Sequence, residues 1–162
     1  MNFNNHQVIL TAYIVSNLVG LLYLFAAIKR PKLARLMFLL LFSWASWINY
    51  TTCHQHPEIY LKYAEKSIGI YADFINGWFK GHITILVSCI AIIQGLIAFG
   101  MLLKGNWVKI ACIGAIIFLI GIAPLGVYSA FPFSLTVSAA AYFIILKDDK
   151  DYLWRVKRKS RK

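Results

Sequence analysis

The chain has 162 residues, of which 60% are hydrophobic, 15% aromatic and only 14% charged. The charged share lies well below the roughly 25% of an ordinary soluble domain, which excludes a typical soluble globular fold. The net charge is +11, but the basic residues stand beside long apolar segments, where lipid headgroups explain them, so we do not expect nucleic acid as a partner.

Four long segments of the sequence contain no Asp, Glu, Lys, Arg or His. They are residues 8–28, 36–52, 83–103 and 110–146. A helix needs about 20 residues, at a rise of roughly 1.5 Å each, to cross the hydrocarbon layer of a bilayer. The segments therefore predict a multi-pass protein whose surroundings are the lipid bilayer. The N-terminal "MNFNNHQ" lacks the features of a cleaved secretory signal, so we expect the first span to be retained.

The last apolar block, 110–146, has 37 residues, which is too long for one crossing and enough for two short ones. Within it, "APLGVYSAFP" contains Pro124, Gly126 and Pro132, which disfavour one continuous helix. We therefore predict an all-α bundle of five transmembrane helices in a single membrane domain over 1–162. The predicted spans are about 8–28, 36–52, 83–103, 108–124 and 129–146.

Basic residues are distributed unevenly among the segments that connect these spans. The 29–35 loop has four, the turn with Lys104 and Lys109 has two and the tail 147–162 has eight, whereas the loop 53–82 has three. Because Lys and Arg collect on the cytoplasmic side, this distribution predicts an N-terminus outside and a C-terminus inside. A composition rich in Ile, Asn and Lys is typical of an AT-rich bacterial genome.

The long outer loop, 53–82, has an amphipathic pattern. Apolar and aromatic residues such as Ile70, Phe74 and Trp78 recur at helical spacing, and charged residues mostly take the other side. Pro57 can begin such a helix and Gly77 can end it. The pattern predicts an amphipathic helix on the membrane surface, or alternatively a lid packed over the mouth of the bundle.

A group of potential metal ligands borders this loop. Cys53, His54, His56 and Glu58 follow the second span, and His82 precedes the third. If these two spans are antiparallel neighbours, their axes lie about 8–10 Å apart, so the side chains can converge on a transition metal such as zinc or copper. The alternative is that these histidines only form the polar edge of the spans.

Polar residues inside the spans suggest a second kind of site. Gln94 lies at the centre of the third span, and Asn49 lies on the second, with Trp44 and Trp47 on an adjoining stripe. These four residues can line a cavity for a flat, polar-headed cofactor such as a quinone. The alternative is that the amides only join helices, at about 0.6–2 kcal/mol for each interhelical hydrogen bond.

Part of the chain resembles the DoxX-like family of small bacterial membrane proteins. The residues that follow Arg35, "LMFLLLFSWASWINYTTCHQHPEIYLKY", look like the opening of that family, and "ITILVSCIAIIQGLIAFGMLLKGNW" is similar to its second span. The resemblance covers about residues 35–146 and leaves the first span as an addition. It implies a four-helix core in a bacterial inner membrane and a role as an accessory or quinone-linked subunit.

Two functional hypotheses follow. In the first, the chain is an accessory or subunit without catalytic activity of its own, which binds another membrane protein or a second copy of itself. The lack of charged residues in the spans favours it, since ion-coupled pumps need ionisable groups there. In the second, the chain is a quinone- or metal-binding redox component. Passive conduction of a neutral solute is a third possibility without a distinctive feature behind it.

Overall fold

The structure is a computed structural model that describes residues 3–129 and 131–155. The described residues are almost entirely helical and contain no strand, which confirms the predicted all-α class. The elements are α1 (Phe3–Lys29), α2 (Pro31–Gln55), η1 (Pro57–Glu65), α3 (Gly69–Asn76), η2 (Phe79–Gly81), α4 (Ile83–Leu102), α5 (Asn106–Ile122), η3 (Ala123–Ser129) and α6 (Phe133–Lys147).

Four helical segments are long and apolar enough to cross a membrane. Three lie in α1, α2 and α4, and the fourth is α5 continued into η3 as far as Gly126. The fifth long apolar helix, α6, has only 15 residues. A multi-pass membrane protein is therefore the class that the fold defines. The helix α2 is longer than the predicted span 36–52, because Pro31 begins it and it continues to Gln55.

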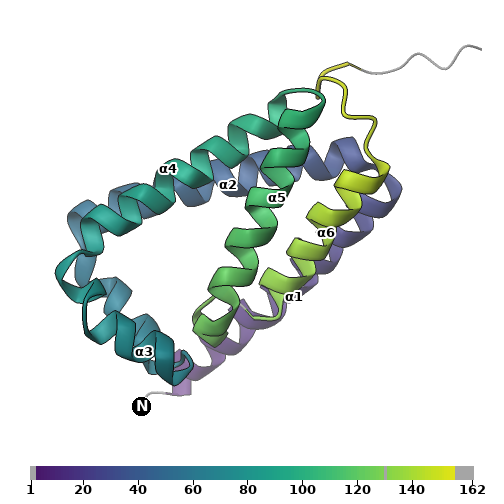
Figure 1. The fold of residues 1–162 in the computed structure, drawn as a ribbon. Helices are drawn as coiled ribbons and strands as arrows, with labels where there is room; N and C mark the ends of the chain where they lie inside the picture. The colour runs from purple at the N-terminus through teal and green to yellow at the C-terminus, as the bar shows by residue number, and fades with distance from the viewer. Residues whose placement is uncertain (1–2, 130, 156–162) are drawn as a thin grey trace, which may run out of the picture.

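The five long helices form a wedge (Figure 1). In it, α2 lies along α4, α1 lies along α6, and α5 lies between the two pairs. At the narrow end, α1 connects to α2 and α4 connects to α5. The tail after Lys147 also begins there. At the wide end, η1, α3, η2 and η3 connect the diverging helices. Residues 57–81, which contain η1, α3 and η2, are called the lid below.

Close contacts hold the helices together at the narrow end. A β-carbon at Gly100 of α4 would lie 2.6 Å from the β-carbon of Ala111 in α5, so only glycine permits this approach. Phe38, Met101 and Val137 are fully buried in the adjoining core. Small residues such as Gly100 and Ala111 let helix backbones approach closely, which is how helices associate within a bilayer, where lipid removes the hydrophobic driving force between them.

Arg35 lies at the centre of the narrow end, although its sequence position in a basic segment predicts a place in a cytoplasmic loop. It is fully buried, because Pro31 begins α2 and thus places Arg35 one turn inside the helix. Its Nη1 donates to Asp148 Oδ1 at 2.9 Å and to the Asp151 carbonyl at 2.7 Å. Nη2 donates to the carbonyls of Met101 and Leu103, both at 2.7 Å. Arg35 therefore ties α2 to the end of α4 and to residues 148–151.

The tail beyond α6 folds back onto the narrow end. Lys32 Nζ donates to the Arg155 carbonyl and lies 3.5 Å from Asp149 Oδ2, and the Gly105 amide donates to the Lys150 carbonyl at 2.6 Å. The first part of the predicted cytoplasmic tail, 147–162, is thus packed against protein. Its last part, 156–162, lies outside the described residues.

The lid differs from the single amphipathic helix that the sequence predicts. It consists of a 3-10 segment, η1, and a separate α-helix, α3. Between them Ile68 is extended, and its amide donates to the Pro124 carbonyl of η3 at 3.2 Å. This bond across the wide end replaces a bond within a helix, which explains the break.

Candidate ligand-binding site

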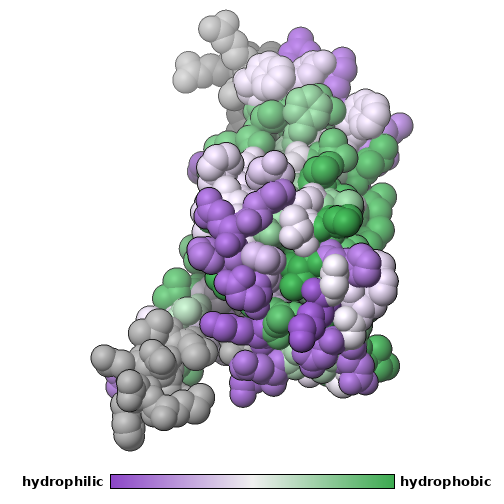
Figure 2. Space-filling view, turned by 90° about the vertical axis from the view of Figure 1, so that its left-hand side faces the viewer, coloured by the Kyte–Doolittle hydropathy of each residue, from purple (hydrophilic) through white to green (hydrophobic). Residues whose placement is uncertain are grey.

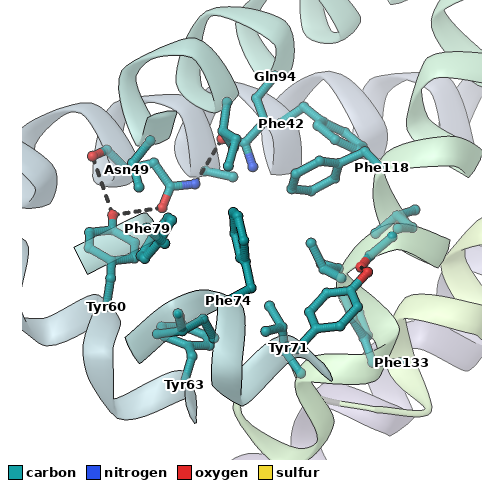
Figure 3. A pocket seen from close by; sticks show the side chains of 18 of the residues that line it. Phe42, Asn49, Tyr60, Tyr63, Tyr71, Phe74, Phe79, Gln94, Phe118 and Phe133 are labelled. Carbon is teal, nitrogen blue, oxygen red and sulfur yellow. Dashed lines mark hydrogen bonds between the residues drawn. The ribbon is translucent and has the colours of Figure 1, made fainter. Parts of the chain in front are cut away.

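A cavity of about 480 Å³ lies beneath the lid, between the diverging helices. This volume is within the roughly 300–1,000 Å³ of small-ligand sites. Figure 3 shows aromatic side chains that surround it on several sides. Those of the lid are Tyr60, Tyr63, Tyr71, Phe74 and Phe79, and those of the long helices are Phe42, Phe118 and Phe133. The lining residues are mostly aromatic or aliphatic and include no charged side chain among the described residues.

A short chain of hydrogen bonds crosses one wall of the cavity (Figure 3). The Tyr60 hydroxyl donates to Asn49 Oδ1 at 2.9 Å and to the Asn49 carbonyl at 3.3 Å. Asn49 Nδ2 in turn donates to Gln94 Oε1 at 2.9 Å. The chain connects the lid to α2 and α2 to α4, and it is called the amide relay below.

The amide relay ends on a hydrogen-bond donor without a partner. Gln94 is only 2% exposed, and within the described part of the chain its Nε2 makes no hydrogen bond. In Figure 3 this nitrogen points toward the interior of the cavity. Gln94 Nε2 therefore offers a hydrogen-bond donor to a ligand atom, in a cavity wall that is otherwise largely apolar.

Burial raises the pKa of two tyrosines of the lid, Tyr60 and Tyr63. It raises the pKa of Tyr60 to about 12, with further contributions in the same direction from Cys53 and Tyr63, against a smaller lowering by Thr52. Burial also raises the pKa of Tyr63. The Tyr60 hydroxyl therefore stays protonated at neutral pH and remains a donor to Asn49.

The lid is attached to α2 and to α5. On one side Tyr60 bonds to Asn49 of α2, and on the other the Tyr71 hydroxyl donates to the Gly121 carbonyl of α5 at 2.9 Å. Close packing adds to this attachment, because a β-carbon at Gly126 of η3 would lie 2.5 Å from the Lys66 carbonyl oxygen. The lid therefore closes the wide end as a docked segment.

The four predicted cofactor-binding residues separate into two pairs. Asn49 and Gln94 meet in the cavity wall, as described above. Trp44 and Trp47 do not line the cavity, and their exposed fractions are 64% and 67%. Trp47 borders a shallower groove of about 340 Å³ between α2 and α4. The structure thus brings the two amides together and leaves the two indoles on the surface of α2.

The five predicted metal ligands do not converge on one point. Each contacts residues close to it in the sequence. His54 Nδ1 is 2.7 Å from the Tyr50 carbonyl and 3.3 Å from Cys53 Sγ. His56 Nδ1 is 3.4 Å from Glu58 Oε1 on an exposed surface. His82 stacks on Trp78, with 4.3 Å between ring centroids. Among the described residues, no three or more His, Cys, Asp or Glu side chains form a group that could hold a metal ion.

The aromatic lid residues of the cavity were missed as site residues. Their helical spacing is equally typical of an amphipathic helix at headgroup depth, which the same pattern predicts. A signal for the lid alternative is present in its charge. Lys62, Lys66 and Lys80 are balanced by Glu58, Glu65 and Asp73. A loop with near-zero charge favours contact with protein over contact with anionic lipid.

Comparison with known proteins adds no assignment. No protein-family model, curated protein or solved structure gives a significant match to this chain. The class that the fold and site define is therefore a multi-pass helical membrane protein with a cavity of small-ligand size.

Proposed function

We propose that this protein binds a lipophilic small molecule in the cavity beneath the lid. The observation that carries this proposal is the combination of an apolar, aromatic cavity of about 480 Å³ with one unpaired amide nitrogen in its wall. Sites for small molecules typically combine a largely apolar lining with a few placed polar groups. The lining offers neither a nucleophile with a base nor a pair of carboxylates, so the proposal is binding without catalysis.

The proposal includes a topology of five spans, with the N-terminus outside and the C-terminus inside. In this arrangement α6 is the fifth span, about 22 Å long at 1.5 Å per residue and packed along α1. The narrow end, where most basic residues gather, faces the cytoplasm of a bacterium, and the lid faces outward. The cavity then lies in the outer half of the bilayer, within reach of molecules dissolved in lipid.

A relation to the DoxX-like family is part of the same proposal. The helices α2, α4, α5 and α6 would supply the four-helix core, and α1 would be the addition. A quinone is one flat lipophile that such a cavity suits. The local contacts of the histidines favour no metal, so the redox hypothesis is kept only in its quinone form.

An accessory role in binding another membrane protein is a second candidate, and the exposed apolar residues of the lid favour it. Ile70 is 79% exposed, and Ile68 and Trp78 are also exposed. Figure 2 shows hydrophilic and hydrophobic side chains interleaved over the lower half of the face on which the lid lies. Such a surface suits a partner protein or lipid headgroups.

The ligand-binding proposal is tested by filling the cavity. Ala45 lines the cavity on α2, so Ala45→Phe places a ring in the ligand's volume. Ala139 of α6 is exposed, so Ala139→Phe adds the same ring outside the cavity. We expect native mass spectrometry of protein extracted gently from its own membrane to detect a bound small molecule. The Ala45→Phe variant should lose this molecule and Ala139→Phe should retain it. Equal retention by both variants would contradict the proposal.

A further inference from the structure

The amide relay runs from Tyr60 through Asn49 to Gln94 in this structure. The Tyr60 hydroxyl donates to Asn49 Oδ1, and Asn49 Nδ2 donates to Gln94 Oε1. Gln94 then uses its oxygen as the acceptor and keeps both hydrogens of Nε2 for the cavity. An amide can in principle offer either an acceptor or a donor. Here the relay leaves only the donor for a ligand.

The surroundings of this donor exclude charged ligands. The described lining residues include no charged side chain that could pair with a ligand charge. An unpaired charge in an apolar site is strongly disfavoured by the loss of its hydration. The ligand of this cavity must therefore be neutral where it meets Gln94.

Aromatic rings define where the rest of the ligand lies. Phe42 and Phe118 pack edge to face near Gln94, with ring centroids 5.9 Å apart, and Phe74 of the lid points into the cavity opposite them (Figure 3). Gln94 stands 11 residues into α4, about 16 Å below the lid end of that helix at 1.5 Å per residue. A ligand with its polar atom at Gln94 thus places its body among these rings.

We infer that the ligand is a neutral lipophile whose head is a hydrogen-bond acceptor of the carbonyl class, bound with the carbonyl oxygen on Gln94 Nε2. This inference rests on the proposed function, because it names the ligand class of the same cavity. Gln94 contacts the ligand directly. Asn49 and Tyr60 act through Gln94 as positioning residues, because they determine which atom of its amide faces the cavity.

The experiment compares two probes of nearly equal shape, 2-acetylnaphthalene and 2-ethylnaphthalene, by equilibrium dialysis against the full chain in nanodiscs. Empty nanodiscs correct for partition into lipid. We expect the ketone to bind the native protein roughly three- to tenfold more tightly than the hydrocarbon, the range of one net hydrogen bond. Equal affinities would overturn the carbonyl inference while leaving the proposed function intact. Failure of both probes to bind would overturn the proposed function itself.

Two variants assign the preference to the amide relay. Gln94→Met keeps the side chain's length but removes its donor, so it should abolish the preference for the ketone and change the affinity for the hydrocarbon by less than about twofold. Asn17→Leu removes a span amide that donates to the Tyr13 carbonyl of its own helix and does not line the cavity, so it should keep the preference. A preference that persists in Gln94→Met would overturn the role of Gln94.

A third variant and an infrared measurement keep the inference testable if Gln94→Met does not fold. Tyr60→Phe frees the Asn49 amide to rotate, so it should weaken the preference while the hydrocarbon still binds. In the native protein, the carbonyl stretch of the bound ketone should lie at a lower wavenumber than in lipid, because a hydrogen bond weakens the C=O bond. A stretch identical to that in lipid would overturn the inference.

Discussion

Arg35 illustrates how one buried residue can organise an end of this molecule. It has no exposed side-chain surface, and its donors reach the last turn of α4 and the tail. A buried arginine is tolerated only when its donors are satisfied, because its charge loses hydration on burial. The pairing with Asp148 therefore compensates the buried charge of Arg35 at the narrow end.

Breaking the buried pair of Arg35 with Asp148 should destabilise the protein more than breaking the partly exposed pair of Lys32 with Asp149. Asp148→Ala leaves Arg35 buried without its counter-charge, which we expect to lower the free energy of unfolding by about 3–5 kcal/mol. Asp149→Ala removes the partly exposed pair with Lys32 and an acceptor for the Asp151 amide, and we expect it to cost less than Asp148→Ala, about 1 kcal/mol. Denaturation of both variants in detergent micelles measures the difference. Equal losses would show that the Arg35 pair has no special role.

Periodicity in α2 explains why only part of the site could be predicted from single residues. Asn49 shares a helix face with Phe42 and Ala45, which stand seven and four residues before it, and all three line the cavity. Trp44 and Trp47 fall on another face of the same helix. The sequence contains this periodicity, but which face meets a cavity depends on how the helices diverge, and no local pattern encodes that divergence.

At the scale of elements, the long helices could be predicted from the sequence. For the lid, the sequence predicted an amphipathic segment but not its position or its break. Uninterrupted apolar segments identify membrane helices, because every backbone polar group in lipid must be satisfied within the helix. The lid instead depends on bonds to distant residues, such as that from Ile68 to Pro124. Its amphipathic pattern left two alternatives, and the structure has the lid of the second one, broken into two pieces.

Attachment of the lid should depend on Gly126. Its φ of +69° belongs to the region that favours glycine, and a β-carbon there would meet the Lys66 carbonyl oxygen. Gly126→Ala should therefore loosen the lid and speed hydrogen exchange at the Ile68 and Tyr71 amides on the order of tenfold. Gly69 lies in the lid with open space around its own β-carbon position, so Gly69→Ala is the matched control. Unchanged exchange in Gly126→Ala would mean that the lid is held elsewhere.

At the scale of the whole molecule, the wedge relates stability to the cavity. The narrow end is closed by the contact of Gly100 with Ala111 and by the Arg35 cluster. The helices are therefore held together at the narrow end. They diverge toward the wide end, where the cavity lies. The close contact of small residues at the narrow end and the aromatic side chains around the cavity are the sequence features behind this shape.

The central claim is that a neutral lipophile binds in the cavity beneath the lid, and photolabelling tests it most directly. The label is benzophenone, a neutral aromatic ketone that inserts into nearby C–H bonds under ultraviolet light, and the protein is reconstituted in vesicles. Peptide mass spectrometry then locates the adducts. The account predicts that they concentrate in residues 41–49, 71–79 and 118–122, which border the cavity, and that Ala45→Phe suppresses them while Ala139→Phe does not. Adducts spread along the lipid-facing side of α1 and unaffected by Ala45→Phe would contradict it.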